Sequence, residues 1–200
     1  MFHRSLLACA LVVVFLATLA PAALAAAVRI RVEGQTQTIF GAAQPTAQAG
    51  NALEALELAS LAGEFYYHVQ TTSFGPFVDQ IGRFPAAGAN GWVFKVNGAL
   101  PPVGADKVTL RDGDVVLWYF SAFTPSGAGS PTLDVQRDGS STCYRVTQLN
   151  DQGVRTSAAG AVLLVDGRRV STRSGRGCVG KHRGLVRATL TGAVRSHAVR

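Results

Sequence analysis

The chain has 200 residues, of which 48% are hydrophobic, and it carries a net charge of +7 at pH 7. This length accommodates one domain or two small ones, with the hydrophobic content of a globular protein. The basic residues have no aromatic residues interleaved among them, which argues against a nucleic-acid-binding protein.

The charge is unevenly distributed along the chain. Residues 26–131 contain six basic and eight acidic residues, whereas residues 132–200 contain twelve basic and four acidic ones. A basic half of this kind favours contact with anionic polymers such as cell-wall phosphates or polysaccharides. The alternative is a surface that is rich in arginine because the genome is rich in GC, with no ligand attached to it.

Residues 1–27 predict a signal peptide. Arg4 precedes an almost unbroken apolar run from Ser5 to Leu19, and small residues before the cleavage point fit a cut after Ala25 or after Ala27. The run is shorter than the about 20 apolar residues of a comfortable membrane span, so an uncleaved anchor is the weaker interpretation. We therefore expect a protein that is secreted, extracellular or held in the cell envelope, with no stable membrane span after cleavage.

Strands are predicted both before and after one helix along the chain. Residues 28–32 alternate apolar and polar side chains, which indicates a half-buried strand, and residues 35–40 return from it as a hairpin. Residues 64–70 predict a third strand, and Val78–Ile81 is the best part of a fourth. These segments place a helix between the second and third strands.

The helix is predicted over Ala52–Ala62, where alanine and leucine dominate. Asn51 is the expected N-cap, and Glu54 stands in capping-box position three residues later. Gly63 stands where a C-terminal stop belongs. No other segment after the signal peptide predicts a helix.

Residues 91–120 contain both tryptophans and predict the centre of the sheet. A strand is expected at the start of this stretch, and Lys107–Leu110 is expected to be extended again. Asp112-Gly113 is a hairpin signal. The continuous apolar run Asp114–Phe120 then predicts a central strand buried on both faces.

The second half predicts a small all-β domain. Residues 124–131 are rich in glycine, serine and proline, which is typical of a linker. Short strands without a helix then follow at about ten-residue spacing and suggest a β-sandwich. The predicted strands are Leu133–Gln136, Cys143–Leu149, Val162–Val165, Leu185–Leu190 and Ala193–Val199.

The cysteines predict one disulfide. Cys9 leaves with the signal peptide, so Cys143 and Cys178 remain as a pair in an oxidising compartment. A bridge between them constrains the unfolded chain by roughly 3–4 kcal/mol. Two free thiols are the alternative.

Four segments, in order, resemble the transcobalamin-like C-terminal domain family: residues 51–56, 91–98, 104–106 and 110–116. The likeness covers residues 28–121 and implies a β-grasp fold, in which one helix crosses a mixed sheet. In transcobalamin and intrinsic factor this domain covers one face of cobalamin, so the resemblance implies a cobalamin-like corrinoid as candidate ligand.

The second half resembles a bacterial immunoglobulin-like surface module through residues 160–167 and 192–196. The expected fold class is therefore α+β: a β-grasp domain followed by a small all-β immunoglobulin-like sandwich. The expected domains are a signal peptide (1–27), a β-grasp domain (28–123), a linker (124–131) and a sandwich domain (132–200).

Catalytic and metal-binding motifs are missing from the sequence. It has no Gly-x-Ser-x-Gly nucleophile motif, no His-Glu-x-x-His motif and no phosphate-cradling glycine loop. The histidines are scattered, and His68 in an aromatic strand fits a partly buried structural residue. Asp112 and Asp114 fit turn chemistry better than a calcium site. We therefore expect a protein that is not an enzyme and has no metal site and no cofactor.

The candidate ligand-binding residues lie in the first half. They are aromatic residues, or residues at the edge of the 91–120 stretch, that a small domain can place beside a ligand. They are Tyr66, Tyr67, Trp92, Asn97, Pro101 and Pro102.

The expected function is a non-enzymatic binding module for a small molecule, for which a corrinoid is the sharpest version. The alternative is a structural or accessory protein of the cell envelope. Such a protein would bind a protein partner, for example by strand addition, or a wall polymer.

Overall fold

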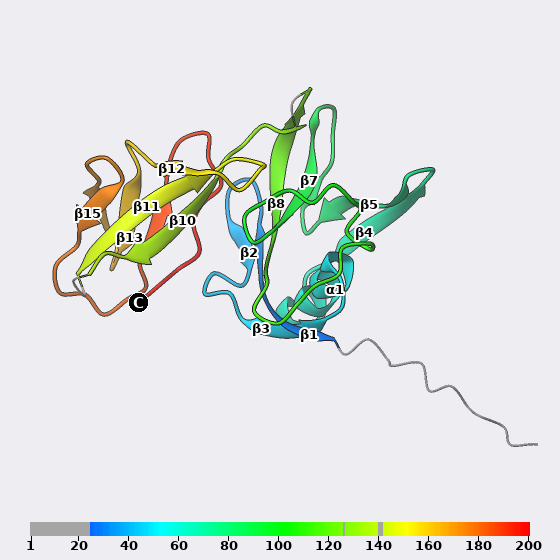
Figure 1. The fold of residues 1–200 in the computed structure, drawn as a ribbon, viewed down its shortest axis with the longest axis horizontal. Coiled ribbons are helices and arrows are strands. Elements are labelled where there is room, and N and C mark those ends of the chain that lie inside the picture. The colour runs from blue at the N-terminus through cyan, green and yellow to red at the C-terminus, as the bar shows by residue number, and fades with distance from the viewer. Residues whose placement is uncertain (1–24, 126, 140–141) are drawn as a thin grey trace, which may run out of the picture.

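The computed structural model describes residues 25–125, 127–139 and 142–200, so the predicted signal peptide lies almost entirely outside the described residues. The described part of the chain contains sixteen strands and one helix. Figure 1 shows two groups of elements side by side, which we call the first half (residues 25–128) and the second half (residues 132–200). Each has its own hydrophobic core.

A six-stranded sheet organises the first half, with β1 and β8 at its centre in the order β2-β1-β8-β7. β1 and β8 run parallel, with Ile30 opposite Val116, whereas β7 pairs with β8 in antiparallel fashion. β3 and β9 add to β1 and β8. The strands are β1 (Ala26–Glu33), β2 (Thr38–Phe40), β3 (Thr46–Ala49), β7 (Asn90–Val96), β8 (Val115–Thr124) and β9 (Gly127–Ala128).

The helix α1 (Ala52–Gly63) packs against β3 and β1 through buried alanine and leucine side chains. Asn51 caps it as predicted, because its Oδ1 accepts a hydrogen bond of 2.8 Å from the backbone N–H of Glu54. The Glu54 carboxylate accepts in turn from the N–H of Gly50 at 2.7 Å, one residue before the predicted partner. Gly63 is the last residue of the helix, and the left-handed residue that stops it is Glu64, at φ 50°, rather than the predicted Gly63.

A separate three-stranded sheet follows the helix: β4 (Tyr67–Thr72), β5 (Gly75–Ile81) and β6 (Phe84–Pro85), in the order β4-β5-β6. It is tied to the main sheet because the indole N–H of Trp92 donates to the carbonyl oxygen of Phe84 at 2.8 Å. The rings of Trp92 and Phe120 also form a T-shaped pair, with 5.5 Å between ring centroids.

Two small sheets form the second half and enclose one core of buried apolar side chains. The first has the order β10-β11-β12, with β15 also paired to β11, and the second has the order β14-β13-β16. The strands are β10 (Thr132–Arg137), β11 (Cys143–Leu149), β12 (Arg155–Ser157), β13 (Val162–Val165), β14 (Arg168–Ser171), β15 (Arg176–Cys178) and β16 (Arg187–Thr189).

The predicted disulfide is confirmed: Cys143 and Cys178 are bonded and stand opposite each other on neighbouring antiparallel strands. The bridge therefore fastens β15 to β11, the central strand of its sheet. None of the helices in the described part of the chain is long and apolar enough to span a membrane.

The predicted fold class was wrong. The described chain is mainly β, with several sheets and a single twelve-residue helix, rather than an α+β β-grasp domain followed by an immunoglobulin-like sandwich. The strands after the helix do not all join one mixed sheet, because β4, β5 and β6 pair only among themselves in the described residues. The predicted domain limits stay a prediction, and β9 lies inside the predicted linker.

Two predicted strands are absent. Lys107–Leu110 has no strand partner, and β8 pairs with β1 instead of forming a hairpin across the Asp112-Gly113 turn. That turn reaches β1, since Asp112 Oδ1 accepts from the N–H of Ala27 at 2.8 Å. Ala193–Val199 runs irregularly along the contact between the halves, where the N–H of Ala198 donates to the carbonyl oxygen of Ala42 at 2.7 Å.

Candidate functional site

A cleft of about 590 Å³ lies between the two halves, and we call it the junction cleft. β1 and the start of β8 form one wall, and β10 with the C-terminal segment forms the other. Its lining residues are Arg29, Arg31, Gln44, Asn97, Gly98, Val115, Leu117, Thr132, Leu133, Asp134, Val135, Gln136, Arg137, Leu149, Arg155, His197, Val199 and Arg200.

The alternation of β1 explains how charged side chains reach this cleft. Even-numbered residues such as Ile30 face the core beneath α1, so Arg29, Arg31 and Glu33 share the opposite face of the strand. Sequence reasoning reads such a polar face as exposed to solvent. The second half covers it instead, and both Arg31 and Glu33 are buried.

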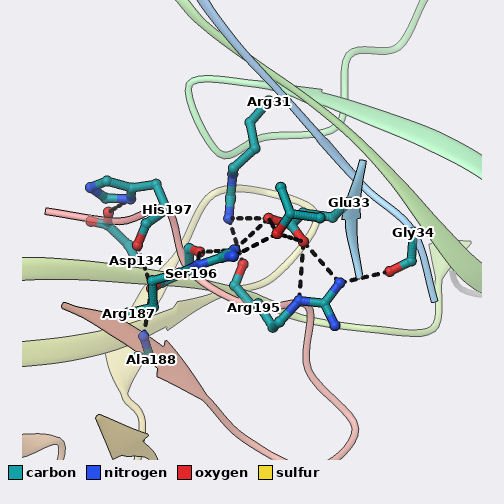
Figure 2. A network of polar contacts seen from close by, with 10 residues as sticks. Arg31, Glu33, Gly34, Asp134, Arg187, Ala188, Arg195, Ser196 and His197 are labelled. Carbon is teal, nitrogen blue, oxygen red and sulfur yellow. Dashed lines mark hydrogen bonds and ion pairs between the residues drawn. The ribbon is translucent and has the colours of Figure 1, made fainter. Parts of the chain in front are cut away.

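Glu33 is the centre of a polar network that joins the two halves (Figure 2). Its Oε1 atom lies 3.2 Å from the guanidinium of Arg31 and 2.6 Å from that of Arg187, and its Oε2 atom lies 2.9 Å from that of Arg195. The Thr38 hydroxyl donates to the same carboxylate. One buried carboxylate therefore faces three guanidinium groups, which leaves an excess of positive charge at this end of the junction.

Arg31 connects this network to the cleft. It is 2% exposed, and its guanidinium also donates to the carbonyl oxygen of Arg195 at 2.6 Å. Its Nε atom has no hydrogen-bond partner among the described residues. Burial lowers the pKa of Arg31 to about 10, although the Glu33 carboxylate opposes this shift. The low pKa reflects a cation that the protein compensates incompletely.

Asp134 provides the only carboxylate side chain among the described residues that line the cleft. It pairs with Arg155, and the imidazole of His197 lies 3.4 Å from its Oδ1 atom. Burial lowers the pKa of His197 to about 4; the Asp134 carboxylate opposes this shift, and the neighbouring Arg31 and Arg29 add to it. His197 is therefore kept neutral mainly by its burial.

We expect acid to destabilise the protein through His197. The folded state has the lower pKa, so as the pH falls from about 6.5 to about 4 the unfolded chain binds a proton that the folded chain rejects. Stability then decreases by up to about 3 kcal/mol over this range. Urea unfolding at a series of pH values should show this slope, and His197→Gln should flatten it.

His68→Gln is the matched control. The side chain of His68 is half exposed and bonds to Asp79, and neither residue lines the junction cleft. This variant should keep the slope of the unmodified protein. An unchanged slope in His197→Gln would contradict the assignment.

The predicted aromatic binding residues lie outside this cleft. Tyr66 is 59% exposed just before β4, and Tyr67 begins that strand. Trp92 is 3% exposed, with its indole N–H already bonded to Phe84, so it belongs to the core. None of the three is among the residues that line the junction cleft.

Of the other predicted residues, only Asn97 reaches the cleft. It follows β7 in the left-handed region at φ 52°, and its side chain bonds the carboxylate of Asp114 and the N–H of Val115. Pro101 and Pro102 lie in the loop after β7 and do not line the cleft. The binding role of all six predicted residues stays a prediction.

The arginines of the cleft and His197 were not predicted as binding residues from the sequence. Two features of the sequence could have pointed to them. The first is the charge of residues 29, 31 and 33 at alternate positions of a predicted strand, and the second is the excess of basic residues in the second half. Nothing in the sequence indicates that these two features meet. Within the described residues, no group of three or more His, Cys, Asp or Glu side chains could hold a metal ion.

Part of the chain matches the model of a known family. Residues 51–122 match the family described as a domain of unknown function (DUF4430). This range runs from the N-cap of α1 into β8, so β1 and the second half lie outside it. The predicted transcobalamin-like relationship is not confirmed, and no curated protein matches the chain.

Among solved structures, the chain is similar to a crystal structure described as a "putative metal binding protein" from Ruminococcus gnavus. The identity is 17% and the TM-score is 0.39, over 50% of this chain and 99% of that one.

Proposed function

We propose that this protein is an exported, non-enzymatic binding module that holds an anionic ligand in the junction cleft. The observation that carries the proposal is the charge of the cleft. Five arginines line it against one aspartate, and Arg31 is buried beside the positive network around Glu33. The lining arginines are Arg29, Arg31, Arg137, Arg155 and Arg200.

Arginine suits this role because its planar guanidinium donates two parallel hydrogen bonds to a phosphate or carboxylate group. Arg29, Arg137, Arg155 and Arg200 are exposed and can reach a ligand, whereas the buried Arg31 contributes a charge that water screens weakly. Valine and leucine residues line both walls, from β8 and from β10; they lower the local dielectric constant and strengthen this attraction.

Export is supported by the predicted signal peptide and by the disulfide, which is consistent with an oxidising compartment. We propose that cleavage follows Ala25. That cut leaves all eight residues of β1, whereas a cut after Ala27 removes two of them, including the Ala27 N–H that bonds Asp112.

Isothermal titration calorimetry with inorganic phosphate, pyrophosphate and citrate tests the proposal. We expect the purified protein to bind the multivalent anions, with an affinity that falls as salt rises. The double variant Arg29→Gln/Arg155→Gln should lose roughly tenfold or more in affinity, because it removes two charge-assisted contacts.

The matched control is Arg111→Gln/Arg173→Gln, which removes the same charge from exposed positions outside the cleft lining, one in each half. It should keep the affinity. Equal losses in both variants would indicate a diffuse charge effect, and no binding of any anion would contradict the proposal.

Cyanocobalamin and cobinamide belong in the same titration, because a corrinoid is the sharper version of a small-molecule ligand. Binding of a corrinoid without an effect of Arg29→Gln/Arg155→Gln would move the site to Tyr66, Tyr67 and the other predicted residues. The alternative of a protein partner bound by strand addition is separated by a pull-down from the native cell envelope.

A further inference from the structure

A second basic cavity, of about 930 Å³, adjoins the junction cleft, and we call it the outer hollow. It is lined by Arg137, Thr142, Asp166, Lys181, His182, Arg183 and Arg200. Two of these residues, Arg137 and Arg200, also line the junction cleft. The two cavities are therefore neighbours with a common border.

The border consists of two exposed basic residues. Arg137 ends β10, and its Nε–H group donates to the carbonyl oxygen of Arg200. This bond holds the backbone of Arg200 against β10 and fixes the side chain of Arg137 at the boundary. A ligand that passes from one cavity to the other must pass these two guanidinium groups.

Positive charge continues beyond the border. Lys181 and Arg183 are exposed in the outer hollow, so the two cavities together present seven lysine or arginine side chains against two aspartates. One of these, Asp166, already accepts hydrogen bonds from the N–H groups of Arg183 and Gly184, which lower its pKa. Its charge is thus engaged in holding the loop that carries Arg183.

Among the residues that the structure describes, no phenylalanine, tyrosine or tryptophan lines either cavity. Single-stranded nucleic acids are typically held by bases stacked on such rings. The two cavities therefore lack the aromatic rings on which nucleobases typically stack. Their repeated arginine and lysine side chains instead match phosphate groups that recur along a flexible chain.

We propose that the junction cleft and the outer hollow form one continuous track for a phosphate-bearing polymer. This inference rests on the proposed anion-binding function and extends it from a single anion to a chain of anions. Occupation of both cavities by one chain makes the second contact intramolecular, which raises the affinity without any new type of contact.

The test measures the affinity of the purified protein for pyrophosphate, short-chain polyphosphate, long-chain polyphosphate and poly(glycerol phosphate). We expect the affinity per chain to rise by about tenfold or more from pyrophosphate to the long chains. Lys181→Gln/Arg183→Gln should abolish this gain and leave pyrophosphate binding unchanged, because both residues lie only in the outer hollow.

Arg169→Gln/Arg173→Gln is the matched control, since it removes two exposed arginines outside both cavities. It should keep the gain with length. If pyrophosphate binds but longer chains bind no better, the track is wrong while the anion site stands. If no anion binds, both proposals are wrong.

Two further ligands test the chemistry of the polymer. Single-stranded DNA should bind no more tightly than polyphosphate of equal charge, because no phenylalanine, tyrosine or tryptophan of the described lining is available for base stacking. Tighter binding of DNA would overturn the exclusion of nucleobases, and tighter binding of polygalacturonate, which carries carboxylates, would overturn the assignment to phosphate groups.

Discussion

Replacing Glu33 by glutamine should lower the free energy of unfolding by about 3–5 kcal/mol. Glu33 is fully buried and is the carboxylate that faces Arg31, Arg187 and Arg195. Without it, three guanidinium groups repel one another in a junction that solvent barely reaches. Chemical denaturation of Glu33→Gln and of the unmodified protein measures the difference.

The control is Glu57→Gln, which changes an exposed carboxylate on α1 and should alter stability by less than about 0.5 kcal/mol. Adding Arg195→Met to Glu33→Gln should recover part of the loss, because the second change removes one of the uncompensated charges. A loss below about 1 kcal/mol in Glu33→Gln would show that the network contributes little.

Removing the disulfide through Cys143→Ala/Cys178→Ala should lower the free energy of unfolding by roughly 3–4 kcal/mol. The bridge joins residues 35 positions apart, and its loss frees the unfolded chain more than the folded one. The loss should appear as a lower denaturation midpoint in urea. Unfolding of the unmodified protein in reductant should give the same midpoint.

Alkylation provides the independent check on this bond. Neither Cys143 nor Cys178 should react with iodoacetamide unless the protein is reduced first. Modification of both thiols without reduction would contradict the disulfide, and a double variant as stable as the unmodified protein would contradict its contribution to stability.

Local signals in the sequence predicted several elements well. Asn51 and Glu54 identified the start of α1, because a side-chain cap acts within a few residues. The predicted bounds of Cys143–Leu149 and Val162–Val165 coincide with β11 and β13. These segments have short apolar runs between turn residues, so their conformation needs little information from elsewhere in the chain.

Elements that depend on distant partners were predicted poorly. Lys107–Leu110 has β-branched residues but no neighbouring strand, since β1 occupies the position beside β8. Ala193–Val199 alternates like a strand, yet its backbone bonds to residues of both halves instead of one ladder. The fold class failed for the same reason, because the number of sheets depends on pairings that residue patterns do not encode.

In the candidate site, too, local features were predictable from the sequence and contacts with distant residues were not. Arg29, Arg31 and Glu33 could be placed on one face of a strand from alternation alone. Their burial and their charge partners could not, because Arg187 and Arg195 lie more than 150 positions later. The aromatic candidate residues were chosen because of their residue type. The cleft, in contrast, exists because the two halves pack against each other, which residue type does not indicate.

The separation of 162 positions between Glu33 and Arg195 also sets the order of assembly. A chain synthesised from its N-terminus presents Glu33, with Arg31 and Thr38 as its local partners, well before Arg187 and Arg195 become available. Contacts between residues so far apart in sequence carry a large loop-closure cost, so we expect them to form after the local contacts of each half. The junction cleft has walls from both halves, and it therefore forms only when the two halves have docked. Ligand binding should consequently report on this docking, and a change in the second half can disable a site that begins at β1.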